Sequence, residues 1–137
     1  MNLIKLFSKT TGFFETTSHM AFAISEDSSG SSKAWQISWG KGVSVNLKVK
    51  KLLKKKGFGN IKYQSPHEEH GHFVVRGFWV VVKCSRNQAN QEYVSYGMGA
   101  DQGSYQHAEE KALLNLRHYD TDWNDSYGYS ISRKGIF

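Results

Sequence analysis

The chain has 137 residues, of which 18 are Lys or Arg and 12 are Asp or Glu, giving a formal net charge of +6. Its length suits one domain spanning residues 1–137, and its 14% aromatic content and single proline argue against extensive disorder. The one cysteine, Cys84, excludes an internal disulfide and a metal cage built from cysteines.

The N-terminal residues contain no apolar run of membrane-spanning length, because Lys5 and Lys9 interrupt it. We therefore expect no membrane partner and a cytoplasmic, reducing location. For residues 1–17, a flexible segment and an ordered one both stay open.

The first predicted elements are two strands joined by a polar loop. Residues 20–25 and 34–42 contain aromatic and β-branched side chains, which favour strands. Residues 26–33 between them include the sequence Ser-Ser-Gly-Ser-Ser, which is typical of a flexible hairpin tip.

Residues 45–56 are predicted to form a helix with two contrasting faces. At 100° per residue, Val45, Val49, Leu52 and Leu53 lie on one face, and lysines cover the other. Gly57 is a suitable residue to end this helix.

The rest of the chain predicts three strands, a second helix and a last strand. Their expected ranges are 61–64, 72–84 and 92–99 for the strands, 105–117 for the helix and 127–132 for the last strand. Ala108 and Ala112 in the apolar stripe of the second helix predict a close approach to the sheet. Gly97 and Gly99 are expected to turn the chain from strand to helix.

Two parts of the chain share one order of elements. The six residues from Ile37 to Gly42 align without a gap on the six from Val94 to Gly99, and each stretch precedes a helix. We infer two β-β-α repeat units, at about 20–56 and 78–117, that arose by duplication. The expected fold is α+β, with one antiparallel sheet of four to six strands and both helices on one face.

The positive charge is concentrated in residues 43–62, which hold seven lysines and no acid. Six of them belong to the first predicted helix: Lys48, Lys50, Lys51, Lys54, Lys55 and Lys56. A charged outer face is common for a helix, but a face of lysines without glutamates is less so, since like charges repel at this spacing. These lysines are therefore the candidate contacts to RNA or another polyanion.

A cluster of imidazoles supplies the weak metal candidates His67, His70 and His72. Its spacing is not that of the H-E-x-x-H motif, and the neighbouring Pro66 and Gly71 indicate a turn, where side chains need not converge. We expect neither a metal nor a cofactor at these histidines.

One further stretch matches part of a catalytic motif. His107-Ala-Glu109 has the H-x-E pattern of zinc deaminases, but the P-C-x-x-C that completes such a site does not follow. With no complete catalytic motif, we expect a protein that is not an enzyme.

Over residues 45–117 the predicted order is helix, strand, strand, strand, helix. The stretch from His70 to Phe73 and the Gly97-Met-Gly99 turn before an alanine-containing helix resemble features of the double-stranded RNA-binding domain. The resemblance implies RNA recognised by shape through the first helix, the inter-strand loop with His70 and His72, and the start of the last helix. The lysine cluster that this family carries at the start of its last helix is missing here, at residues 105–109.

Two functions stay open on these observations. The first is a binding module that holds RNA or another polyanion through the lysine helix. The second is a protein-interaction or homo-oligomeric module that uses sheet edges and the aromatic residues between 119 and 129.

Overall fold

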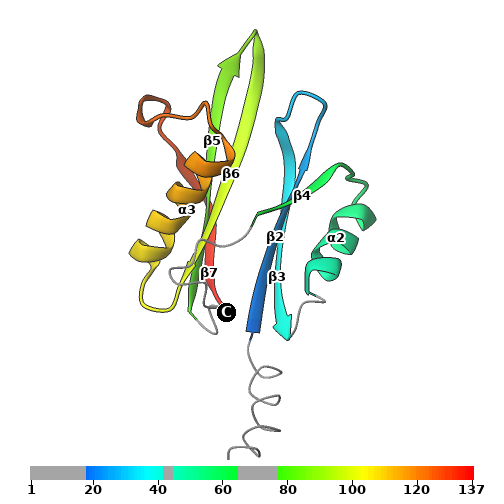
Figure 1. Ribbon diagram of the computed structural model, residues 1–137, viewed down its shortest axis with the longest axis vertical. Coiled ribbons are helices and arrows are strands. Elements are labelled where there is room, and N and C mark those ends of the chain that lie inside the picture. The colour runs from blue at the N-terminus through cyan, green and yellow to red at the C-terminus, as the bar shows by residue number, and fades with distance from the viewer. Residues whose placement is uncertain (1–17, 42–44, 65–76) are drawn as a thin grey trace, which may run out of the picture.

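The computed structural model describes residues 18–41, 45–64 and 77–137, which form two antiparallel sheets of three strands (Figure 1). The elements of the first half are β2 (Ser18–Glu26), β3 (Ser32–Lys41), α2 (Val45–Lys55) and β4 (Ile61–Gln64). Those of the second half are β5 (Phe78–Gln88), β6 (Gln91–Asp101), α3 (Tyr105–Tyr119), the 3-10 turn η2 (Asp125–Tyr127) and β7 (Ser130–Ile136).

The two halves have the same connectivity. The strand orders are β3-β2-β4 and β6-β5-β7, so each half is a hairpin followed by a helix and a third strand. In each half the third strand pairs antiparallel with the first strand of the hairpin. Duplication as the origin of this likeness stays a prediction.

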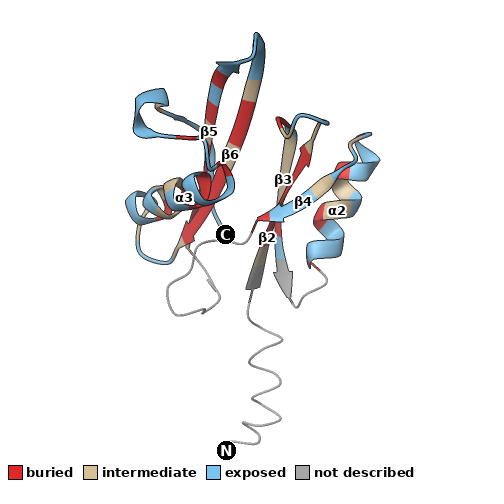
Figure 2. Ribbon diagram, turned by 45° about the horizontal axis from the view of Figure 1, so that its top comes forward, coloured by how far each residue is buried: buried red, intermediate tan, exposed pale blue. Residues whose placement is uncertain are grey.

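The two sheets face each other, and each helix covers the outer face of its own sheet (Figures 1 and 2). The layer between the sheets contains Phe22, Ile24, Trp79, Val81, Met98 and Ala100. The layer beneath α2 contains Ala21, Ala23, Val45, Val49 and Leu53. The layer beneath α3 contains Val80, Val82, Cys84, Ala108, Ala112, Leu116 and Trp123. The molecule is thus a four-layered sandwich of helix, sheet, sheet and helix.

The α+β class and the antiparallel pairing are confirmed, but the expectation of one sheet with both helices on one face is wrong. The reason lies in strands that are apolar on both faces. Val80 and Val82 of β5 pack against α3, whereas Trp79 and Val81 pack against the other sheet. Because side chains alternate along a strand, a single sheet with helices on one side would leave the second apolar face in water.

The β5–β6 hairpin is longer than predicted, because its strands also take up most of residues 85–91, which the predicted strands 72–84 and 92–99 leave out. The strands continue to a two-residue turn at Ala89 and Asn90, which both have positive φ angles, 53° and 64°. The end of β5 was not recognised as a strand because it contains polar residues. In the structure, exposed Ser85 and Asn87 alternate with buried Cys84 and Arg86. Residues 72–76 of the predicted strand lie outside the described residues, and the last strand is Ser130–Ile136 rather than 127–132.

Gly97 and Gly99 lie within β6 and not at a turn, so their predicted role is wrong. A Cβ atom on either residue would lie 2.3 Å from a backbone oxygen of α3, that of Ala112 or of Ala108. The close approach of α3 that the two alanines predicted is confirmed, since both are fully buried against the sheet. Glycine is required here because the helix backbone touches the strand.

One buried side chain joins the two sheets. Gln64 ends β4 and is 2% exposed, yet its amide reaches the free edge of β6 in the opposite sheet. Its Nε2 donates to the carbonyl of Tyr96 at 2.9 Å, and its Oε1 accepts from the N–H of Met98 at 2.7 Å. Two backbone groups of this strand edge, the carbonyl of Tyr96 and the N–H of Met98, are therefore satisfied by a side chain in place of another strand.

Candidate functional site

Helix α2 is fixed to the outer face of the first sheet by residues spaced four apart. Val45, Val49 and Leu53 are at most 5% exposed and pack on the β2 alanines. The helix ends at Lys55, and Gly57 terminates it as predicted. The φ of Gly57 is +92°, in the left-handed region, and the N–H of Phe58 bonds back to the carbonyl of Leu53 at 3.0 Å. The remaining positions of the helix are exposed, except for Lys50 and Leu52, which are half-buried.

The lysine face of α2 consists of Lys48, Lys50, Lys51, Lys54 and Lys55. All are exposed except Lys50, which is half-buried. Among the described residues, no carboxylate lies within ion-pairing distance of any of them. Within the described part of the chain, the face therefore presents five lysines on one helix without an ion-pair partner.

The lysines that flank α2 differ from the lysine face because they have partners. Lys62 lies 3.0 Å from Glu26, and this contact raises the pKa of Lys62 above its ordinary value. Lys56, a predicted contact residue, donates from Nζ to the Oε1 of Gln36 at 2.8 Å. The structure thus places five of the six predicted lysines on one helix, where no described carboxylate pairs with them, and gives the sixth a neutral partner.

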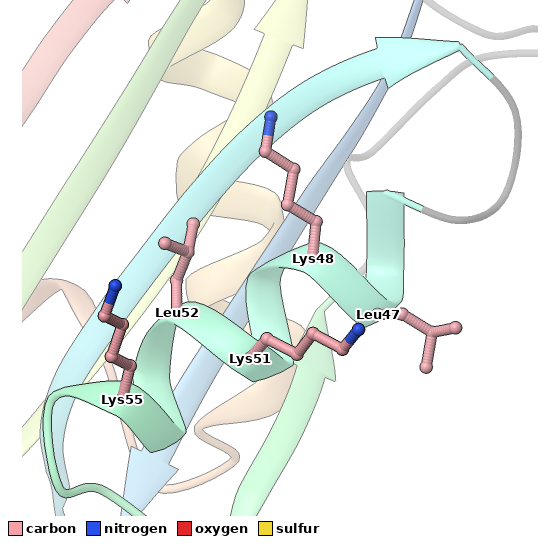
Figure 3. Close-up of a pocket in the computed structure, with 5 residues that line it drawn as sticks. All are labelled: Leu47, Lys48, Lys51, Leu52 and Lys55. Atoms are coloured by element: carbon pink, nitrogen blue, oxygen red, sulfur yellow. The ribbon is translucent and has the colours of Figure 1, made fainter.

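A shallow hollow of about 350 Å³ runs along the outside of α2 (Figure 3). It is lined by Leu47, Lys48, Lys51, Leu52 and Lys55. Leu52, which was expected on the buried face, is only half-buried and extends to the same side of the helix as Lys48 and Lys55. Leu47 is 60% exposed and extends to the other side with Lys51. The surface is therefore cationic at the amino groups and apolar at their base.

Tyr63 of β4 borders the first turn of α2, and the sequence analysis missed it. Its hydroxyl donates to the carbonyl of Asn46 at 3.2 Å, while the residue stays 44% exposed. The pairing of Tyr63 with Ala23 places it on the sheet face that carries α2. The sequence did contain a signal for the position of Tyr63. Ile61 and Tyr63 are two residues apart in a short strand, so their side chains lie on the same face of the sheet.

The start of α3 is closed to an added anion by the chain's own carboxylate. Asp101 Oδ2 accepts from the N–H groups of Gly103 at 2.7 Å and Ser104 at 3.2 Å, and Oδ1 lies 2.8 Å from Nζ of Lys111. Burial raises the pKa of Asp101, but these contacts outweigh it, and the pKa lies below its ordinary value. This helix start is therefore an internally satisfied cap.

The remaining charged cluster of the described chain is buried and ties α3 to the β5–β6 hairpin. Arg86 and Asp120 form a two-point ion pair, with N–O distances of 2.5 and 2.9 Å. Ser95 Oγ donates to the same carboxylate at 2.6 Å, and the rings of Tyr93 and Tyr127 lie 4.6 and 5.1 Å from the guanidinium carbon. With its donors and acceptors engaged inside the protein, the cluster serves the fold.

The three histidines named as metal candidates, His67, His70 and His72, lie outside the described residues. Within the described ranges, no group of three or more His, Cys, Asp or Glu side chains is placed to hold a metal ion. No helix in the same ranges has the length and apolar character needed to cross a membrane.

Comparison of the chain with protein-family models, with curated proteins and with solved structures gave no match. Function must therefore be inferred from the geometry and charge of the chain itself, and the lysine face is the surface with the clearest chemistry.

Proposed function

We propose that the protein is a non-catalytic binding module that holds RNA by its phosphates through the lysine face of α2. The observation that carries this proposal is five lysines on one helix without a carboxylate partner among the described residues. Lysines at i,i+3 and i,i+4 spacing repel one another, so the arrangement costs stability. A polyanion removes that repulsion, and the release of its counterions favours binding.

The contact is assigned to α2 alone. The resemblance to the double-stranded RNA-binding domain implies that a first helix and the start of a last helix contact one RNA together. Here α2 and α3 pack on the outer faces of different sheets, and Asp101 occupies the start of α3. The proposal therefore keeps the anionic partner and leaves out that family's mode of recognition.

A charge-reversal variant tests the proposal. The triple variant K48E/K51E/K55E removes the lysines that line the hollow, and the control K33E/R133E/K134E makes the same change of charge on other exposed positions. Both variants have a formal net charge near zero. In fluorescence anisotropy with a labelled 20-nucleotide RNA at low salt, we expect the first variant to lose about tenfold or more in affinity.

The control variant is expected to stay within about threefold of the parent, because it removes only long-range attraction. Equal losses in the two variants would show that RNA is attracted by net charge and not by α2. Melting temperatures of all three proteins establish that the variants are folded.

The alternative function is a protein-interaction or homo-oligomeric module, and β7 is the feature that favours it. This strand forms an edge of the second sheet, where Ile131 is 42% and Ile136 is 66% exposed. Exposed edge strands pair readily with other chains. Light scattering distinguishes the two functions, since a dimer favours this alternative and a monomer at all concentrations weakens it.

A further inference from the structure

We infer that the lysine face prefers single-stranded to double-stranded RNA, and that Tyr63 is the platform on which one base stacks. The inference rests on the proposed RNA-binding function and adds a substrate class and a contact residue to it.

The first argument is the size of the surface. Helix α2 has 11 residues and is therefore about 16 Å long. A module that recognises duplex RNA by shape reaches across two successive minor grooves and about 16 base pairs. The lysine face is too short for that and has no partner surface on α3, which lies on the opposite side of the sandwich. A few consecutive phosphates of one strand match its length.

The second argument is an exposed aromatic ring on the strand next to α2. Tyr63 lies beside the first turn of α2, and the bond from its hydroxyl to the Asn46 carbonyl fixes the orientation of the ring. The residue nevertheless remains 44% exposed. An anchored and exposed ring next to a lysine-rich helix is the combination with which proteins hold single strands, because the cations follow the backbone while bases stack on the ring.

The third argument is the apolar part of the hollow on α2. Leu47 is 60% exposed and Leu52 is half-buried, and both line the hollow between the lysines. A single strand exposes the apolar faces of its bases, whereas a duplex buries them in its own stack. The apolar side chains thus have a partner in a single strand and none in a duplex.

The test compares labelled 10-nucleotide single strands and a blunt RNA duplex on the full chain. Tyr63→Ala is expected to lower single-strand affinity by about fivefold or more and to leave duplex affinity within about twofold. Tyr63→Phe keeps the ring but loses the hydroxyl bond to Asn46, so it should retain most but not all of the single-strand affinity. Tyr119→Ala, which removes a tyrosine of similar exposure (47%) on α3, is the matched control and should change neither affinity.

An abasic strand separates stacking from a structural role of the tyrosine. It has the phosphates but no bases, so the parent and Tyr63→Ala should bind it equally. If Tyr63→Ala loses affinity equally for the single strand, the duplex and the abasic strand, the inference is overturned. If the triple variant K48E/K51E/K55E still lowers RNA affinity in that case, the proposed function stands. Failure of every RNA to bind the parent overturns both.

Discussion

The carboxylate of Asp120 holds the end of α3 in place through charge and hydrogen bonds together. Burial raises its pKa, but the hydrogen bonds from Arg86 and Ser95 outweigh burial, and the pKa lies below its ordinary value. The folded protein therefore holds fewer protons at this group than the unfolded chain does. Its contribution to stability is fully present above the unfolded pKa of about 4 and is lost as the pH falls through the lower, folded value.

An Asp120→Asn variant should show this linkage directly. We expect a lower melting temperature than that of the parent at pH 7, because Arg86 stays buried without a counter-charge. Below about pH 4 the difference should shrink, since the parent loses the same charge by protonation. Thermal melts from pH 7 to pH 2 measure the effect, with Asp122→Asn as an exposed control. A difference that is constant across this range would contradict the assigned role.

Cys84 lies beside this cluster and is buried, and its burial raises the pKa of the thiol. A protonated thiol in the layer beneath α3 behaves as a small apolar side chain. The residue thus belongs to the packing of the second half and not to a reactive site.

Helix α2 has a well-packed inner stripe and an outer face of like charges, whose repulsion lowers the stability of the helix. Lys51 has Lys54 and Lys55 three and four residues after it and Lys48 three residues before it. Each like-charged pair at this spacing costs about 0.2–0.5 kcal/mol. A helix selected only for stability would place glutamates among these lysines, which is why we assign the face to binding.

Lys51→Glu should therefore raise stability and lower RNA affinity at once. The new carboxylate attracts the three neighbouring lysines, so we expect the melting temperature to rise by about 2–4 °C. RNA affinity should fall, because a phosphate contact is replaced by repulsion. Arg133→Glu on β7 is a matched change of charge away from the helix and should produce neither effect. A lower melting temperature with unchanged affinity would contradict the assignment.

At the scale of the whole molecule, regular patterns in the sequence predicted the local elements well. The helix at 45–56 is Val45–Lys55, and the one at 105–117 is Tyr105–Tyr119, because apolar stripes and alanines marked their buried sides. Aromatic and β-branched side chains also indicated both hairpins, although the second hairpin extends further than predicted. These features depend on neighbours within a few residues, which a sequence displays directly.

The features that the sequence did not predict depend on distant partners. In the sequence Arg86 looks like a loop residue, because its ion-pair partner Asp120 is 34 residues away. Gln64 likewise becomes a bridge between sheets only because β6 lies opposite it. For the candidate site, the lysines were visible in the sequence, whereas the exposure and anchoring of Tyr63 required β4 to lie beside α2. The division into two sheets depends on the same long-range pairing.

The central claim is that the lysine face of α2 binds RNA phosphates, and the salt dependence of affinity tests it most directly. Three to five contacts to a single strand predict that log Kd rises with log salt concentration with a slope of about 2–3.5. In K48E/K51E/K55E the loss of three contacts should lower that slope by about 2, while K33E/R133E/K134E should keep the slope of the parent. The claim would be contradicted if the slope of log Kd against log salt concentration fell equally in both variants. It would also be contradicted if the slope stayed the same in both.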